Sequence, residues 1–258
     1  MVRQLWEKYA WNHCLSVHAM RDMSGSAMSS RPLIIYATAA VSLTYLHYYG
    51  KAGFFVKTFG KYFEGSSYLN LYALLFWSAS CLVGYVLIPC LIITLMPEES
   101  IRDYGLSFKG FFRHLWIYAI LFAGVFPFIF FSSFTKRFLS VYPFYHFSWR
   151  SSVEFLIFET GYLLQFFALE FFFRGFLLFS VVRYVGAYAI PAMVVPYCMI
   201  HFTGKPFLET LAAIIAGLVL GTLSLRTRSI WPGVLIHCSV ALSMDLLSMM
   251  HKGWFARW

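Results

Sequence analysis

Charged residues are scarce in this chain of 258 residues: they make up 12% of it, with only 11 Asp and Glu against 20 Lys and Arg. A soluble domain usually carries about 25% charged residues, so the composition excludes an ordinary soluble protein. Hydrophobic residues account for 60% of the chain. We therefore predict an all-α polytopic membrane protein, built as a bundle of about seven or eight transmembrane helices.

Cysteine is also rare, and its five residues are odd in number and show no paired spacing. This excludes a disulfide framework or a cysteine-rich zinc module, and it indicates small apolar core residues. The N-terminus lacks a continuous apolar segment with a cleavage site, so no signal peptide is expected. The cysteines are Cys14, Cys81, Cys90, Cys198 and Cys238.

The net charge is +9, but the chain contains no segment of interleaved basic and aromatic residues of the kind that binds nucleic acid. The basic residues flank apolar runs, where they anchor a protein to lipid headgroups. The expected partners are the lipid bilayer and a membrane-associated peptide or protein substrate, with no nucleic acid. Lys and Arg divide almost evenly between the two predicted sides, so orientation and oligomeric state stay open, and a bacterial inner membrane is our expectation from the compact chain.

Residues 1–32 are predicted to form a polar or interfacial segment, and residues 33–258 the helical bundle. The first helix would begin after Pro32, the second would be interrupted at Pro89, and Gly186 would end the fourth. In the sixth helix, small residues four apart should let a neighbouring helix approach closely. The predicted spans are 33–50, 68–96, 115–134, 153–182, 187–202, 208–225 and 230–249.

A carboxylate and a guanidinium lie four residues apart in the apolar run Leu169-Glu170-Phe171-Phe172-Phe173-Arg174-Gly175. This spacing places Glu170 and Arg174 on one helix face, and Glu159 should share that face. A charge at the bilayer centre costs about 2.5–3.5 kcal/mol on insertion scales, so such residues are kept for a pair, a cavity or chemistry. A purely structural ion pair stays open from the spacing alone.

Two histidines, His201 and His237, lie on helices that follow the Glu170 segment. A carboxylate with two imidazoles can activate water, through a metal or by general base catalysis. The order differs from HExxH, so an ordinary zincin is excluded. The candidate catalytic residues are Glu170, His201 and His237, with Arg174 as a supporting ion pair. If a divalent metal such as Zn is bound, the same acid and two histidines are its candidate ligands; a metal-free site is the alternative.

Glu209 and Asp245 are two further candidate site residues. Glu209 follows the Gly204-Lys205-Pro206 break, and Asp245 lies two helical turns after His237. For each, a solvated interfacial position is an equal alternative. The pair Glu98-Glu99 is expected to be a solvated loop face.

Three segments together resemble the CPBP family of membrane proteases, which process CAAX proteins and bacteriocins. The run that contains Glu170 is similar to the first motif, Glu-Glu-x-x-x-Arg. The segment from Tyr197 to His201 is similar to the second, an aromatic residue four before a histidine, and Ser229 to His237 resembles the approach to the third, His-x-x-x-Asn. The turn Asp103-Tyr104-Gly105-Leu106 also looks like the family.

The resemblance covers about residues 100–250 and implies a helical bundle whose site hydrolyses a peptide bond with a Glu/His-activated water. Two of its polar positions are apolar here, since the first Glu falls on Leu169 and the Asn on Ala241. One hypothesis is an active intramembrane endopeptidase in which Glu170 or Glu209 is the base and Asp245 replaces the missing Asn.

The alternative is an inactive CPBP-like protein that acts as a binding, regulatory or immunity factor. An unrelated transporter is a third possibility, against which the lack of an internal repeat counts.

Overall fold

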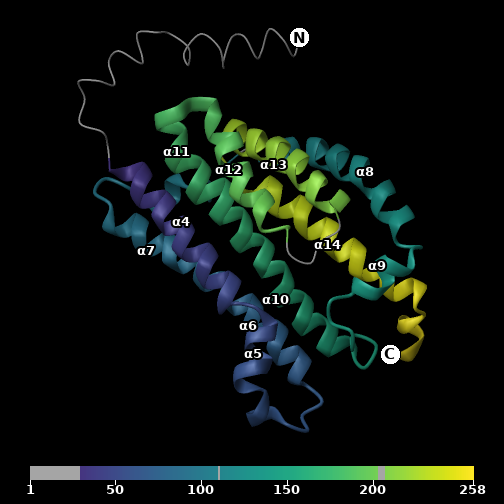
Figure 1. The fold of residues 1–258 in the computed structure, drawn as a ribbon. Coiled ribbons are helices and arrows are strands. Elements are labelled where there is room, and N and C mark those ends of the chain that lie inside the picture. The colour runs from purple at the N-terminus through teal and green to yellow at the C-terminus, as the bar shows by residue number, and fades with distance from the viewer. Residues whose placement is uncertain (1–29, 110, 203–206) are drawn as a thin grey trace, which may run out of the picture.

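The computed structural model describes residues 30–109, 111–202 and 207–258. The predicted N-terminal segment lies almost wholly outside these residues, as does the Gly204-Lys205-Pro206 break. Within the described residues all regular elements are helices, with one isolated bridge between Leu106 and Ser229. The helices pack side by side as an elongated bundle (Figure 1). They are α4 (Arg31–Tyr48), α5 (Ala52–Phe59), α6 (Leu69–Leu82), α7 (Ile88–Leu95), α8 (Leu115–Ser132), α9 (Lys136–Val141), α10 (Ser152–Glu170), α11 (Leu178–Val185), α12 (Ala189–Met199), α13 (Phe207–Thr227) and α14 (Trp231–His251).

Five segments of the described chain are long and apolar enough to cross a membrane. The all-helical architecture is confirmed, and these five candidate spans cover six of the seven predicted spans. The number of seven or eight transmembrane helices stays a prediction. Residues 31–48 form the helix α4 at the position of the first predicted span, but this helix is not among the five. The segments are Leu69–Leu95, Phe112–Ser132, Ser152–Met199, Glu209–Thr227 and Trp231–His251.

The segment Ser152–Met199 contains two of the predicted spans. Its 48 residues would reach about 70 Å as one helix, more than twice the hydrocarbon core of a bilayer. Gly186 ends α11 with a φ of 56°, a left-handed value that glycine adopts without strain. The chain reverses there, so that α12 returns beside α11 (Figure 1). The predicted boundary at Gly186 is confirmed, although α12 ends at Met199, before the predicted limit of 202.

Two helices contain π-helical turns, which widen the backbone by one residue. The first, Val83–Leu87, joins α6 to α7 just before Pro89. The second, Phe171–Leu177, joins α10 to α11 and directly follows Glu170. The predicted interruption near Pro89 is thus present as a π-turn, because proline cannot donate the hydrogen bond of a regular helix.

The small residues of α13 let α12 approach closely, as their four-residue spacing predicts. A Cβ atom at Gly217 would lie 2.9 Å from Val194 and 3.2 Å from Tyr197. A Cβ at Gly221 would lie 3.0 Å from Met193. The approach brings the Tyr197 face of α12 firmly against α13.

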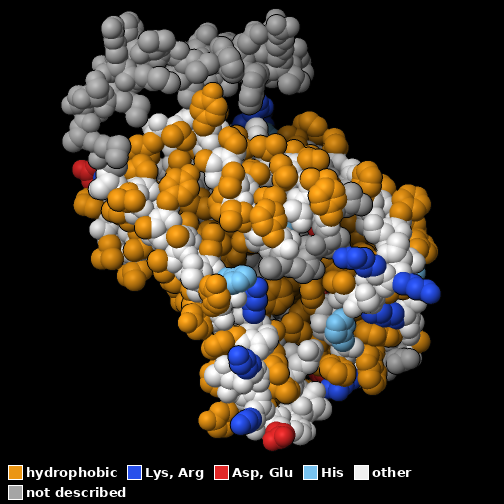
Figure 2. All heavy atoms as spheres, in the orientation of Figure 1, with side chains coloured by type: hydrophobic (Ala, Val, Ile, Leu, Met, Phe, Trp, Pro, Cys, Tyr) orange, Lys and Arg blue, Asp and Glu red, His pale blue; other side chains and the backbone are white. Residues whose placement is uncertain are grey.

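Hydrophobic side chains cover most of the visible surface, while Lys and Arg gather toward one end of the bundle (Figure 2). Helix α8 is the most outward-facing of the long helices, with Phe128 75% and Phe131 71% exposed. Such large exposed aromatic residues suit contact with lipid tails. The four cysteines among the described residues are free.

Candidate active site

Glu170 is the last residue of α10, immediately before the π-turn. The side chains of Glu170 and Arg174 are both fully buried, and Arg174 Nη1 lies 3.0 Å from Glu170 Oε1. The ion pair predicted from the four-residue spacing is therefore confirmed. Burying both charges is tolerated because each compensates the other.

His237 on α14 is the second partner of the Glu170 carboxylate. Its Nδ1 lies 2.6 Å from Glu170 Oε1, across the interface between α10 and α14. Since the carboxylate accepts this bond, the proton lies on Nδ1 and the Nε2 lone pair points away from Glu170. The imidazole stacks on Phe166 with ring centroids 5.7 Å apart and keeps 16% of its side chain exposed.

Gly233 makes this contact between helices possible. It lies one turn before His237, and a Cβ atom there would be 2.0 Å from Glu170 Oε2. Only a glycine leaves room for the carboxylate against the α14 backbone. The position of Glu170 therefore depends on a residue that carries no side chain.

Tyr197 on α12 contacts three of the candidate site residues. Its hydroxyl lies 3.2 Å from His237 Nε2, so it can donate to that lone pair. The Arg174 guanidinium lies 3.9 Å from the centre of its ring, a cation–π contact. Its ring centroid is 5.0 Å from that of His201. In the sequence, Tyr197 stands out only as the aromatic residue four before His201. That spacing places its hydroxyl on the same helix face as the histidine, which could have identified Tyr197 as a site residue.

His201 follows the end of α12 and lies beside Tyr197. Its Nδ1 is 2.9 Å from the Tyr197 carbonyl oxygen, to which it can donate. His201 thus reaches Arg174 and His237 by way of the tyrosine. The structure brings Glu170, Arg174 and His237 into direct contact and adds His201 through Tyr197.

The structure places the two remaining candidates on α13 and α14. Glu209 is in the first turn of α13 and is half-buried. Asp245 is fully buried, two turns along α14 from His237, and its carboxyl group faces that of Glu159 on α10. It therefore forms a second polar contact between the helices that carry Glu170 and His237. The shared face predicted for Glu159 and Glu170 is the one turned toward α14.

Leu169 and Ala241 stand where the resemblance implies polar residues, and both lie among apolar side chains. Leu169 is half-buried and packs against the main hydrophobic core. Ala241 is 3% exposed and lies in a cluster with Leu74 and Phe158. Neither position can supply a proton acceptor, so any base must come from another residue.

The described residues include no group of three His, Cys, Asp or Glu side chains placed to hold a metal ion. Glu170 Oε1 is held by Arg174 and His237, and His201 lies behind Tyr197. The predicted set of Glu170, His201 and His237 therefore does not fit a divalent metal such as Zn in this arrangement.

Residues 151–243 match the family model described as Type II CAAX prenyl endopeptidase Rce1-like. This segment is similar to the CAAX prenyl endopeptidase family. The match contains Glu170, Arg174, Tyr197, His201 and His237, and it lies inside the predicted range of about 100–250. No curated protein and no solved structure matches the chain. The resemblance that the motifs predicted is thus confirmed over residues 151–243.

Proposed function

We propose that this protein is an intramembrane endopeptidase of the CPBP type, which hydrolyses a peptide bond near the membrane surface. The observation that carries the proposal is the 2.6 Å contact between Glu170 Oε1 and His237 Nδ1. A carboxylate that holds the Nδ1 proton leaves Nε2 to accept a proton from water, which is the role of the acid in a hydrolase dyad. The match of residues 151–243 to this family model supports the same reaction class.

In the proposed reaction His237 Nε2 takes a proton as the water oxygen attacks the substrate carbonyl carbon. The proton passes to the leaving amine nitrogen as the carbon–nitrogen bond breaks, giving a carboxylic acid and an amine. The Tyr197 hydroxyl, 3.2 Å from Nε2, gives up this bond when substrate binds and donates to the oxyanion instead. His201 supports Tyr197, and Arg174 is the ion-pair partner of Glu170.

The proposed substrate is a protein segment beside the membrane, such as a C-terminal tail. The name of the matching family refers to prenylated CAAX proteins. A lipid-bearing tail suits an outer surface rich in exposed aromatic and aliphatic side chains. We therefore place a lipidated C-terminal peptide first among the substrates to test.

The second candidate function is a membrane-embedded binding, regulatory or immunity protein that no longer hydrolyses peptides. Leu169 and Ala241 favour it, because the resemblance implies a glutamate and an asparagine at these positions. In this case the Glu170–His237 contact holds the fold together and does not activate water. The two functions differ in whether cleavage requires His237.

The test uses the purified full chain in liposomes with quenched fluorescent peptides, with and without a prenylated cysteine. His237→Ala should lower kcat about 10²–10⁴-fold, the usual contribution of a general base. Tyr197→Phe should lower kcat about 10²–10³-fold, as for an oxyanion donor. His47→Ala, at an exposed position on α4, is the matched control and should cleave as wild type does. Equal cleavage by wild type and His237→Ala would refute the role of His237 as the base. If no peptide is cleaved and a partner co-purifies with wild type but not with Glu170→Gln, the binding function is supported instead.

A further inference from the structure

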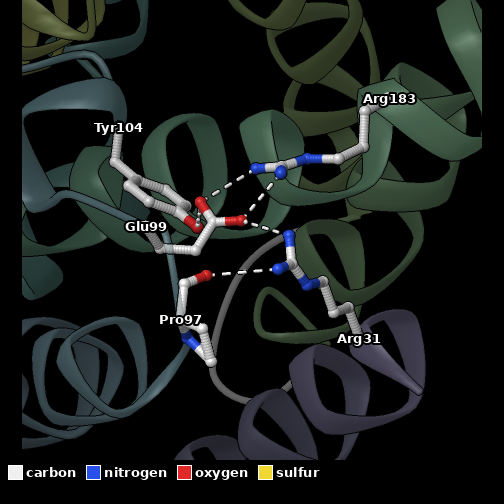
Figure 3. A network of polar contacts seen from close by, with 5 residues as sticks. All are labelled: Arg31, Pro97, Glu99, Tyr104 and Arg183. Carbon is white, nitrogen blue, oxygen red and sulfur yellow. Dashed lines mark hydrogen bonds and ion pairs between the residues drawn. The ribbon is translucent and has the colours of Figure 1, made fainter. Parts of the chain in front are cut away.

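Glu99, in the loop after α7, is buried in a network of polar contacts (Figure 3). Its side chain is 5% exposed, so the prediction of a solvated loop pair is wrong for Glu99, although Glu98 is exposed. Arg183, at the end of α11, lies 2.7 Å from Glu99 Oε1, and Arg31 lies 3.1 Å from the same oxygen. The Tyr104 hydroxyl donates to Oε2 at 2.9 Å. One carboxylate thus ties this loop to the ends of α4 and α11.

From this network the chain runs across the π-turn of the Glu170 helix. Tyr104 is 1% exposed, and a Cβ atom at Gly175 would lie 2.8 Å from its carbonyl oxygen. Gly105 has a φ of 80°, and a Cβ there would lie 2.7 Å from the Phe179 ring. The loop therefore contacts the segment just after Glu170 and Arg174, where glycines on both sides leave no spare room.

The same loop holds the start of α14, the helix that carries His237. The Ile230 amide donates to the Gly105 carbonyl at 2.9 Å, and the Ser229 hydroxyl donates to the Ser107 carbonyl at 2.7 Å. The Trp231 indole donates to the Leu106 carbonyl at 3.0 Å, and its ring stacks on Phe108 at 4.2 Å. These contacts fix the first turn of α14 two turns before His237.

We infer that residues 99–108 are a positioning loop, anchored by Glu99, that sets the distance between Glu170 and His237. The loop touches both helices beyond the same end of their contact, at Gly175 on one and at Ile230 on the other, where a Cβ on Gly175 would lie 3.6 Å from Ile230. Gly233, between Ile230 and His237, already lies against the Glu170 carboxylate, so a small shift of α14 lengthens the 2.6 Å bond or closes on Oε2. The inference rests on the proposed function only for the consequence in catalysis.

The test follows the imidazole of His237 by NMR in the full chain, with ¹⁵N-labelled histidine in lipid nanodiscs. The Nδ1 proton bonded to the Glu170 carboxylate is identified by its loss in His237→Ala. Glu99→Gln and Gly175→Ala should shift or abolish this signal, and Trp231→Phe, which removes only one bond to the loop, should shift it less. The matched controls are Glu98→Gln, at the exposed neighbour of Glu99, and Gly124→Ala, where a Cβ meets nothing within 4 Å.

The size-exclusion profile and the helical content of each variant first show whether it folds as wild type does. The positioning role is overturned if Glu99→Gln and Gly175→Ala fold normally and keep the wild-type NMR signal. In a cleavage assay Gly175→Ala should lower kcat up to about 100-fold with little change in KM, the effect of a displacement of about 1 Å. Since the NMR signal reports the helix contact without cleavage, a wild type that cleaves no peptide contradicts the proposed function alone.

Discussion

The buried carboxylate of Glu170 contacts three residues within the bundle. One oxygen of its carboxylate holds both Arg174 and His237, and the other lies against Gly233. Every partner comes from within the protein, since the side chain is fully buried. A change at any of the three neighbours therefore acts directly on the carboxylate.

Arg174→Met should lower the free energy of unfolding by about 3–5 kcal/mol, because it leaves the buried Glu170 carboxylate without its cation. Glu170→Leu combined with Arg174→Met should restore most of this loss, since no buried charge then remains, but it should not restore cleavage. Unfolding titrations in detergent micelles measure the first effect and the liposome assay the second. Lys57→Met, at an exposed position on α5, is the control and should change stability by no more than about 0.5 kcal/mol. A double variant as unstable as Arg174→Met would contradict this account.

Gly233→Ala should displace the Glu170 carboxylate, because the new methyl group would lie 2.0 Å from Oε2. Overpacking of this kind costs about 1–3 kcal/mol, and the bond to His237 should break with it. Thermal unfolding and the cleavage assay report the two effects. Gly124→Ala adds the same methyl group where no atom lies within 4 Å, and it should leave both measurements unchanged. Wild-type activity in Gly233→Ala would show that the carboxylate position does not matter.

At the scale of elements, α10 and α14 run antiparallel and meet at two polar levels. Glu170 faces His237 at one level, and Glu159 faces Asp245 at the other. Between the levels, Phe166 stacks on His237 and Ala241 packs near Phe158. The polar stripe of α10 is thus matched by a stripe on α14, which keeps the charged groups away from lipid.

The loop after α7 has a pH dependence of its own, centred on Glu99. Burial raises the pKa of this carboxyl, but hydrogen bonds from Arg183 and Tyr104 and the charges of Arg183 and Arg31 outweigh it and bring the pKa below its ordinary value of 4.5. On the other side of the bond, burial and the contact with Glu99 raise the pKa of Tyr104 to about 12, so it stays a donor.

A carboxyl whose pKa is lowered by folding stabilises the fold above its unfolded pKa and loses that contribution as the pH falls through the folded value. The melting temperature in detergent should therefore fall as the pH drops below about 4.5, and Glu99→Gln should lower it at neutral pH and weaken this acid-side dependence. Glu98→Gln is the control and should keep the wild-type pH profile. Identical profiles for wild type and Glu99→Gln would contradict the assignment.

At the scale of the whole molecule, contacts between distant segments define two ends of the bundle. One end joins Arg31, residues 97–108, Arg183 and residues 229–231. The other end joins Ser67 to Arg150, and Tyr142 to Lys252. The five segments that are long and apolar enough to cross a membrane run between these two ends.

Cysteines introduced at Glu98 and Tyr62 should label from opposite faces of a sealed vesicle, because these exposed residues lie beyond opposite ends of the segment formed by α6 and α7. A membrane-impermeant thiol reagent applied before and after permeabilisation measures this. Tyr188→Cys, in the turn between α11 and α12, should label from the same face as Glu98→Cys. Labelling of Glu98→Cys and Tyr62→Cys from one face would contradict the arrangement of spans.

Local sequence determined the membrane class, the positions of most helices, the Glu170–Arg174 pair and the small-residue face of α13. These depend on apolar runs and on helical spacing, which act between residues close in the chain. Tertiary structure alone decided that Glu170 meets His237, that Asp245 turns to Glu159, that Tyr197 lies among the site residues and that Glu99 is buried. These contacts join residues 23 or more positions apart or depend on loop geometry. They follow from the rotation and register of packed helices, which spacing along one helix does not specify.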